Sequence, residues 1–155
     1  MSTAHDDFKH SIQDATDLLA HFDRVNVQPP PENAEVLKRA SLVMALAALE
    51  TYIEDRIIEA AAVTAQGAKE SLLGRFYVDS LANDLRYFHS PSTDKVRNLF
   101  KKYLSLDVTQ GWTWNNYDPA RVKSELDQLV CKRGDIAHRS PPPKRQIPSP
   151  HIVTR

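Results

Sequence analysis

Apolar side chains recur along this chain at steps of three and four residues, a spacing that aligns them on one face of an α-helix. The first such segment runs from about Asp6 to Val25, and the prolines at 29–31 then predict a stiff turn. From Glu32 to about Thr64 the chain has no glycine or proline, which predicts a second helix of about 50 Å. The apolar positions of the first helix are Phe8, Ile12, Ala15, Leu19 and Phe22.

Further helices are predicted in the second half of the chain. One runs from about Lys69 to Phe88 and ends at Ser90-Pro91, and a shorter one is capped by Ser92 or Thr93. After a loop from Ser105 to Tyr117, Asp118-Pro119 pairs an N-cap residue with a proline at the first helical position, which starts a last helix reaching about Arg139. The apolar positions of the third and fourth helices are Leu72, Phe76, Leu81 and Leu85, then Val96, Leu99, Phe100 and Tyr103.

These elements predict an all-α fold, an up-and-down bundle of four to five helices over residues 1–140. Residues 141–155 hold five of the ten prolines and are expected to be disordered. No apolar run approaches the roughly 20 residues of a membrane span, and the polar N-terminus does not resemble a secretory signal. The single cysteine, Cys131, excludes an internal disulfide and a cysteine-based zinc site, and we expect it to be a small residue packed beside an interface. A cytoplasmic location is expected.

The net charge of zero conceals an asymmetry between the two parts of the chain. Residues 1–91 carry 8 Lys/Arg against 14 Asp/Glu, whereas residues 92–155 carry 12 against 6, so the two parts have charges of −6 and +6. A basic C-terminal part is suited to binding a polyanion. It is equally suited to self-association of an acidic face with a basic one.

Two charged residues occupy positions that the helical pattern assigns to apolar side chains. Glu50 lies within the stripe of the second helix, and Arg133 lies within the stripe of the last helix. Buried charges are costly unless they are paired, so we expect these two to form an ion pair. The pair has two interpretations, a structural contact that fixes helix register and a part of a functional site. The two stripes are Val43, Leu46, Glu50, Ile53 and Ile57, and Val122, Leu126, Leu129, Arg133 and Ile136.

His138 follows Arg133 by five positions, so on an ideal helix it points about 140° away and lies about 7.5 Å further along. Asp135 is three residues before His138 on the same face and could orient its ring. A second Arg/His match, Arg145 to His151, falls in the proline-rich tail, where no rigid scaffold would hold it.

The residues around Arg133 resemble a known family. The segment from Leu129 to Arg139 is similar to the Arg-x4-6-His signature of HEPN domains, and the run from Ala47 to Asp55 resembles their glutamate-bearing second helix. The Trp-containing loop from Trp112 to Tyr117 is similar to that of the RiboL-PSP-HEPN branch. The resemblance covers most of residues 8–139. It departs from the family pattern at Gly134, where members commonly have a polar residue.

This resemblance implies an all-α bundle that dimerises, with the Arg/His motifs of two protomers facing one cleft. Many members are metal-independent endoribonucleases, often toxins or defence proteins, and others have lost the chemistry and bind partners. By resemblance, Arg133 and His138 are the catalytic residues. Their positions on the helices give Glu50 and Asp135 the supporting roles described above. No cofactor or metal is expected. The implied partners are an RNA substrate, a second copy of the chain and possible antitoxin proteins.

The chemistry of these residue types fits RNA cleavage. Histidine titrates near neutrality and can move the protons of the 2′-OH and the leaving 5′-oxygen, while an arginine can bind the phosphate oxygens in bidentate fashion. Lys132 and Arg139 either bind RNA phosphates or complement the dipole of the helix end. Trp112 and Trp114 either stack on bases or pack as core and lid. Surface or capping roles, and no metal site, are expected for His5, His10, His21 and His89.

The leading hypothesis is therefore a homodimeric HEPN-type endoribonuclease, with a role as a toxin or antiphage component as one possibility. The first alternative is a catalytically inactive HEPN bundle that binds a protein or a nucleotide. The second is a helical interaction domain in which the motif is accidental.

Overall fold

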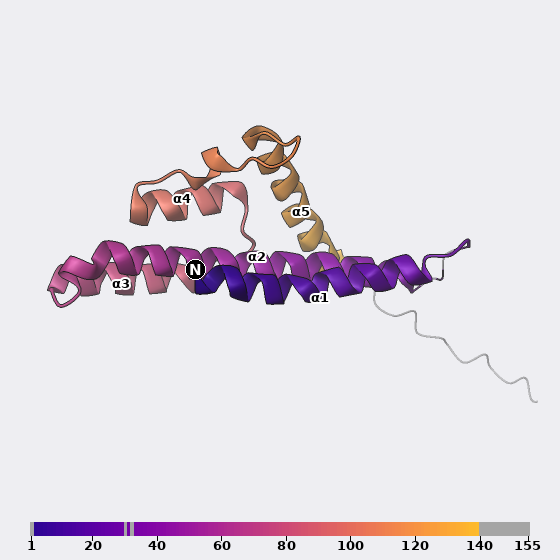
Figure 1. Ribbon diagram of the computed structural model, residues 1–155, viewed down its shortest axis with the longest axis horizontal. Helices are drawn as coiled ribbons and strands as arrows, with labels where there is room; N and C mark the ends of the chain where they lie inside the picture. The colour runs from indigo at the N-terminus through magenta and orange to yellow at the C-terminus, as the bar shows by residue number, and fades with distance from the viewer. Residues whose placement is uncertain (1, 30, 32, 140–155) are drawn as a thin grey trace, which may run out of the picture.

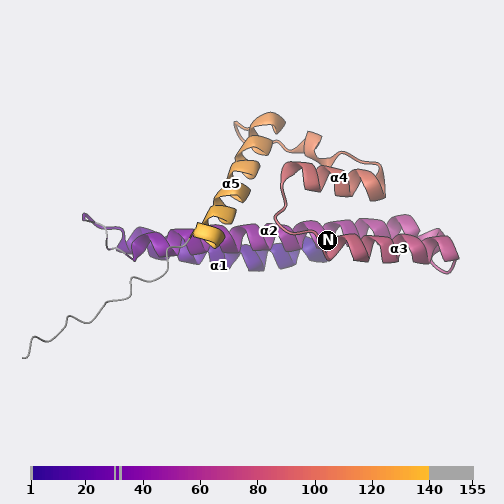
Figure 2. The ribbon, with the colours of Figure 1, turned by 180° about the vertical axis from the view of Figure 1, so that it is seen from behind.

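The computed structural model describes residues 2–29, 31 and 33–139, and within them the chain forms an all-α bundle (Figures 1 and 2). The long helices α1 and α2 lie side by side, with α3 along the far part of α2, while α4 and α5 lie on one side of this layer. The predicted all-α fold is confirmed. The elements are α1 (Thr3–Val25), α2 (Ala34–Ala65), the 3-10 helix η1 (Gln66–Ala68), α3 (Leu72–Leu85), α4 (Thr93–Leu104), the 3-10 helix η2 (Val108–Gly111) and α5 (Pro119–Arg139).

The hairpin of α1 and α2 is held by small buried residues and by polar contacts. The buried Ser41 hydroxyl donates to the carbonyl of Ala15, 2.7 Å away, and ties the two helices together. The first helix begins at Thr3 rather than at the predicted Asp6. Its first turn is capped by Glu59 of α2, whose carboxylate accepts hydrogen bonds from nearby donors and satisfies part of the helix N-terminus. Those donors are the hydroxyls of Ser2 and Thr3 and the backbone N–H of Ala4.

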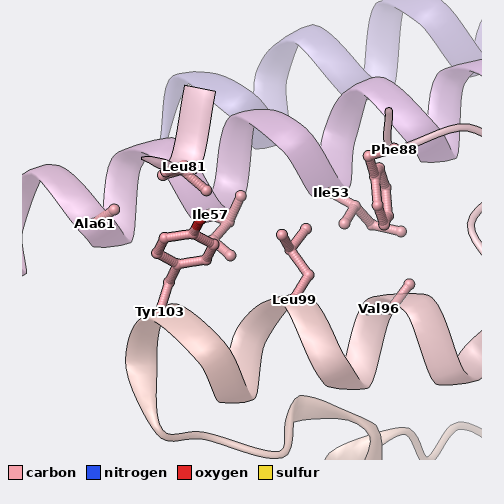
Figure 3. Packing of buried hydrophobic residues seen from close by; sticks show 8 residues of the cluster. All are labelled: Ile53, Ile57, Ala61, Leu81, Phe88, Val96, Leu99 and Tyr103. Atoms are coloured by element: carbon pink, nitrogen blue, oxygen red, sulfur yellow. The ribbon is translucent and has the colours of Figure 1, made fainter. Parts of the chain in front are cut away.

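The largest group of buried apolar residues lies where α2 meets α3, α4 and the segment between them (Figure 3). Ile57 of α2 is fully buried, as the helical pattern predicts for this stripe. Burial of side chains of this size is the main stabilising contribution to such a fold. The cluster consists of Ile53, Ile57, Ala61, Leu81, Phe88, Val96, Leu99 and Tyr103.

The third helix is shorter than predicted and buries less of its apolar stripe. It begins after Ser71, whose hydroxyl accepts from the backbone N–H of Gly74, and it ends at Leu85 rather than Phe88. Leu72 and Phe76 are 81% and 68% exposed, so the expectation that they face the core is wrong. The buried residues of this helix are Gly74, which lies against the backbone of Ala68, and Leu81, which belongs to the core cluster.

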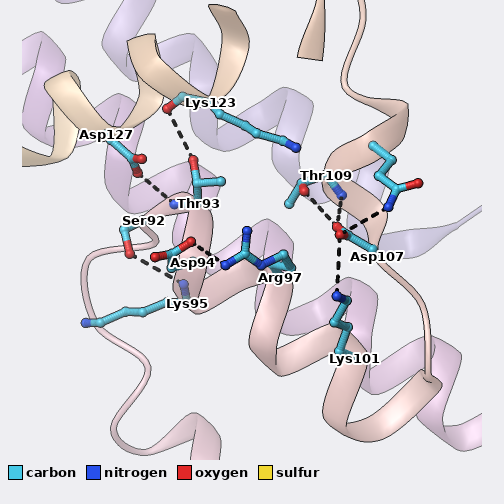
Figure 4. Close-up of polar contacts among 11 residues, drawn as sticks. Ser92, Thr93, Asp94, Lys95, Arg97, Lys101, Asp107, Thr109, Lys123 and Asp127 are labelled. Carbon is cyan, nitrogen blue, oxygen red and sulfur yellow. Dashed lines mark hydrogen bonds and ion pairs between the residues drawn. The ribbon is translucent and has the colours of Figure 1, made fainter. Parts of the chain in front are cut away.

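Helix α4 is tied to α5 at its first residue (Figure 4). The backbone N–H of Thr93 donates to Asp127, 2.8 Å away, and the Thr93 hydroxyl donates to the carbonyl of Lys123. The predicted caps are present, since Ser92 accepts from Lys95 at the start of α4 and Asp118 accepts from Arg121 at the start of α5.

The loop before α5 contains both tryptophans and the 3-10 helix η2. Trp112 packs, partly buried, against the core cluster, whereas Trp114 is exposed and stacks on Tyr117 with ring centroids 6.2 Å apart. Cys131 is exposed in the protomer, so its packing beside an interface stays a prediction. None of the helices described is both long and apolar enough to traverse a bilayer. The tail, with Arg145 and His151, lies outside the described residues.

Candidate functional site

The contact between the central helix α2 and the last helix α5 contains the two charges that the sequence places in apolar stripes. An Nη1 donor of Arg133 lies 3.4 Å from Oε2 of Glu50, so the expected pair is present. Their side chains are 26% and 17% exposed, respectively. Both charges are therefore partly removed from water, and each compensates the desolvation of the other.

The segment between α3 and α4 completes this contact. The backbone N–H of Ser90 donates to Oε2 of Glu50 over 2.9 Å, and Nη1 of Arg133 donates to the Ser90 hydroxyl over 3.2 Å. Ser90 has φ 59°, in the left-handed region, which costs a non-glycine residue about 1–2 kcal/mol. Such a conformation persists where surrounding contacts fix it, and these two hydrogen bonds do so.

A histidine that the sequence analysis assigned to the surface also reaches this contact. Nδ1 of His89 lies 3.6 Å from Oε1 of Glu50, while the ring remains 71% exposed. One carboxylate thus faces a guanidinium, a backbone amide and an imidazole. The sequence offers no spacing signal for this, because the position of His89 depends on how the segment after α3 returns to α2.

A second carboxyl group lies one helical turn from Glu50. The pKa of Glu54 is raised from its ordinary value, first because burial disfavours its charged form and then because Glu50 and Asp55 repel it. The ring of His89 acts in the opposite direction and lowers it. The site therefore concentrates negative charge on α2, opposite the Arg133 guanidinium.

The other residues of the Arg/His motif are placed differently from Arg133. His138 is exposed, and within the described residues no hydrogen bond or ion pair joins it to Arg133 or Glu50. Asp135 and Lys132 are exposed and line a hollow of about 650 Å³ between α1, α2 and α5. The side chain of Arg139 lies outside the described residues. A single protomer thus brings Glu50 and Arg133 together, but not Arg133 and His138.

A second hollow, of about 380 Å³, lies between the α1–α2 layer and the tryptophan loop. Trp112 and Trp114 both line it, together with Phe8, Tyr52 and further apolar side chains, and Glu125 is its one charged lining residue among those described. Among residues 2–29, 31 and 33–139, no three His, Cys, Asp or Glu side chains are grouped so that they could hold a metal ion.

The all-α bundle thus brings a glutamate of the second long helix to an arginine of the last helix. The family model of the RiboL-PSP-HEPN domain matches residues 6–155, and the chain belongs to this family. No curated protein and no solved structure matches the chain.

Proposed function

We propose that this protein is a metal-independent endoribonuclease in which Arg133 and His138 carry the chemistry. The observation that carries this proposal is the fixed position of the Arg133 guanidinium, held at Nη1 by Glu50 and Ser90. A guanidinium has five N–H donors, so contacts through Nη1 leave donors on Nε and Nη2 that can bind a phosphate. An anchored, permanently charged group of this kind is suited to stabilise negative charge on phosphorus.

In the proposed reaction, the 2′-oxygen attacks the adjacent phosphorus and the bond to the 5′-oxygen breaks. One imidazole accepts the 2′-OH proton and another donates a proton to the 5′-oxygen, which gives a 2′,3′-cyclic phosphate and a 5′-hydroxyl end. Positioned acid–base groups typically accelerate such steps by about 10²–10⁴-fold. This chemistry needs neither a metal nor a cofactor.

We propose that the active form is a homodimer. Since His138 is exposed and lies apart from Glu50 and Arg133 in one protomer, a second copy would have to bring the two motifs to one cleft. A two-fold dimer would provide two arginines and two imidazoles at the same site. Lys132 and Arg139, near the motif, would then contact the RNA backbone.

A catalytically inactive HEPN bundle that binds a nucleotide or a protein is the second candidate. The observation that favours it is the separation of His138 from the Glu50–Arg133 pair, together with Gly134 in place of a polar residue. Family membership is compatible with either a nuclease or a nucleotide-binding role.

The test is cleavage of end-labelled RNA in EDTA by the purified protein. We expect Arg133→Ala and His138→Ala each to reduce the rate at least ~10²-fold. The matched controls Arg75→Ala and His21→Ala replace exposed residues outside the site and should leave it unchanged. Because Arg133→Ala also removes an ion pair, Arg133→Lys and a melting curve separate lost folding from lost chemistry. Wild-type activity in His138→Ala would refute the scheme.

A role as a cytoplasmic toxin or antiphage component is part of the same proposal. It predicts that expression arrests growth, that Arg133→Ala relieves the arrest, and that a cognate antitoxin protein suppresses it. Growth unaffected by the wild-type protein at a level that gives cleavage in vitro would contradict this role.

A further inference from the structure

We propose that His89 is a second acid–base group of the cleavage site and that it acts in the same protomer as Arg133. This inference rests on the ribonuclease activity proposed above and adds to it a residue outside the Arg/His motif. The observation behind it is that Glu50 contacts both groups, with Arg133 at Oε2 and His89 at Oε1.

The backbone on both sides of His89 is fixed. Phe88 is buried in the core cluster, and Pro91 is among the most completely buried residues. The carbonyl of His89 accepts from Nζ of Lys95, and the next residue, Ser90, is held to Glu50 in its left-handed conformation. An exposed side chain on a backbone this constrained has the preorganisation that a catalytic group requires. Surface histidines on freely moving loops lack it.

The orientation of the ring suits proton transfer. Nδ1 faces the carboxylate of Glu50, which favours the tautomer with the proton on Nδ1 and leaves Nε2 to exchange a proton with a substrate. The distance of 3.6 Å is longer than a hydrogen bond, as is common in sites that tighten when substrate binds. Since Arg133 and His89 contact the two oxygens of one carboxylate, we place a phosphate bound by Arg133 within reach of this ring.

The charged groups around His89 come from three helices. Glu50 and Glu54 face it from α2, Arg133 lies beyond the Glu50 carboxylate on α5, and Lys95 contacts its carbonyl from α4. Of these groups, the Glu50 carboxylate contacts the ring itself, whereas Lys95 contacts the backbone carbonyl.

The reaction needs two imidazoles, and His89 takes the place of one of the two His138 side chains that the proposed dimer provides. As the bond from the 2′-oxygen to phosphorus forms, its proton passes to one neutral imidazole. As the bond to the 5′-oxygen breaks, a protonated imidazole gives up its proton to that oxygen. His89 supplies one of these imidazoles and His138 the other, so net proton uptake is zero.

The experiment measures single-turnover cleavage of a short labelled RNA at saturating protein between pH 5 and pH 9. The variants are His89→Ala, His89→Gln and the control His21→Ala, whose histidine is exposed on α1. We expect both His89 variants to lower the rate about 10²-fold and to lose one limb of the pH–rate profile. Affinity for a 2′-O-methyl RNA, which cannot react, and the melting temperature should stay at wild-type values.

Each contrary outcome has a distinct meaning. A wild-type rate and pH profile in both His89 variants overturns the role of His89 and leaves the proposed ribonuclease intact. A loss of affinity with an unchanged pH profile makes His89 a phosphate contact and overturns its acid–base role. If His89→Ala fails to fold, the rate and pH profile of His89→Gln test the acid–base role, because the glutamine amide can still contact Glu50 but cannot titrate. If the wild-type protein does not cleave RNA, the proposed function fails and this inference fails with it.

Discussion

Glu50 and Arg133 are 83 positions apart in the chain, and Oε2 of one lies 3.4 Å from Nη1 of the other. The two residues belong to the central helix and the last helix, whose apolar stripes would otherwise be uninterrupted there. Each charge would be costly at such a position without the other. The pair therefore couples the stability of the α2–α5 contact to the geometry of the candidate site.

This coupling is measurable by a double-mutant cycle. Glu50→Gln should destabilise the domain by about 1–2 kcal/mol, less than for a fully buried pair because both side chains retain some contact with water. Arg133→Gln should have a similar effect, and the double variant should lose less than the sum, with a coupling of about 1 kcal/mol. Urea denaturation of the two single variants and the double variant measures these changes in the free energy of unfolding.

The matched control is Asp94→Asn, which breaks an exposed ion pair with Arg97 within α4. It should change stability by less than about 0.5 kcal/mol. Additive effects of Glu50→Gln and Arg133→Gln would show that the contact is not energetically coupled and would remove the register role from this pair.

The sequence predicts the helices because apolar periodicity reports which face of a segment is able to be buried. It also predicts the Glu50–Arg133 contact, since two charges in two apolar stripes need partners. Periodicity does not report whether a neighbouring helix covers that face. Leu72 and Phe76 continue the stripe of α3 but are exposed, and the start of α3 lies beyond the end of α4 (Figure 1).

His89 could not be placed from the sequence for a related physical reason. Its position depends on the path of the segment between α3 and α4, which is set by burial of Phe88 and Pro91 and by the contacts of Ser90. The start of α1 at Thr3 also depends on a tertiary contact, because Glu59 of α2 caps this helix. A cap from a neighbouring residue in the chain, such as Asp118, can be predicted from the sequence, whereas a cap from another helix cannot.

The contribution of Glu59 to folding stability should depend on pH. Its pKa is lowered from 4.5 to about 2, first by the backbone N–H of Ala4 and then by the hydroxyls of Ser2 and Thr3. Since the folded state favours the charged carboxylate, Glu59 stabilises the fold above its ordinary pKa, and this contribution is lost as the pH falls from 4.5 towards 2. Glu59→Gln should therefore be less stable than the wild type at pH 7, with the difference shrinking over that interval.

Urea denaturation at pH 7, 4.5 and 3 measures the Glu59 effect, with Glu70→Gln at an exposed position as the control. A stability difference between Glu59→Gln and the wild type that is independent of pH would show that the cap acts through packing instead of charge.

A glycine at the C-terminal end of α4 should stabilise the protein. Ser105 ends this helix in the left-handed conformation, with φ 55°, and its side chain is exposed. Glycine adopts this conformation without steric cost, so Ser105→Gly should stabilise the protein by about 1 kcal/mol. Ser2→Gly, at the extended N-cap of α1, is a suitable comparison and should not stabilise. Equal melting temperatures for Ser105→Gly and the wild type would contradict this.

Two glycines within helices should respond in opposite directions to replacement by alanine. At Gly74 a Cβ atom would lie 2.0 Å from the backbone oxygen of Ala68, so Gly74→Ala should destabilise by about 1–3 kcal/mol. At Gly134 the added Cβ would meet no described atom within 4 Å apart from its chain neighbours and its own helix backbone, so Gly134→Ala should stabilise the protomer by about 0.5–1 kcal/mol through helix propensity.

The same Gly134→Ala variant tests the proposed dimer. Gly134 adjoins Arg133, and in the protomer the space beside it is open. If a second copy approaches the α5 backbone closely there, the alanine would stabilise the dilute protein but weaken association. Melting temperature and sedimentation, each measured over a range of protein concentration, separate these effects. A stabilisation that is the same at all concentrations, with unchanged association, would place any dimer contact away from Gly134.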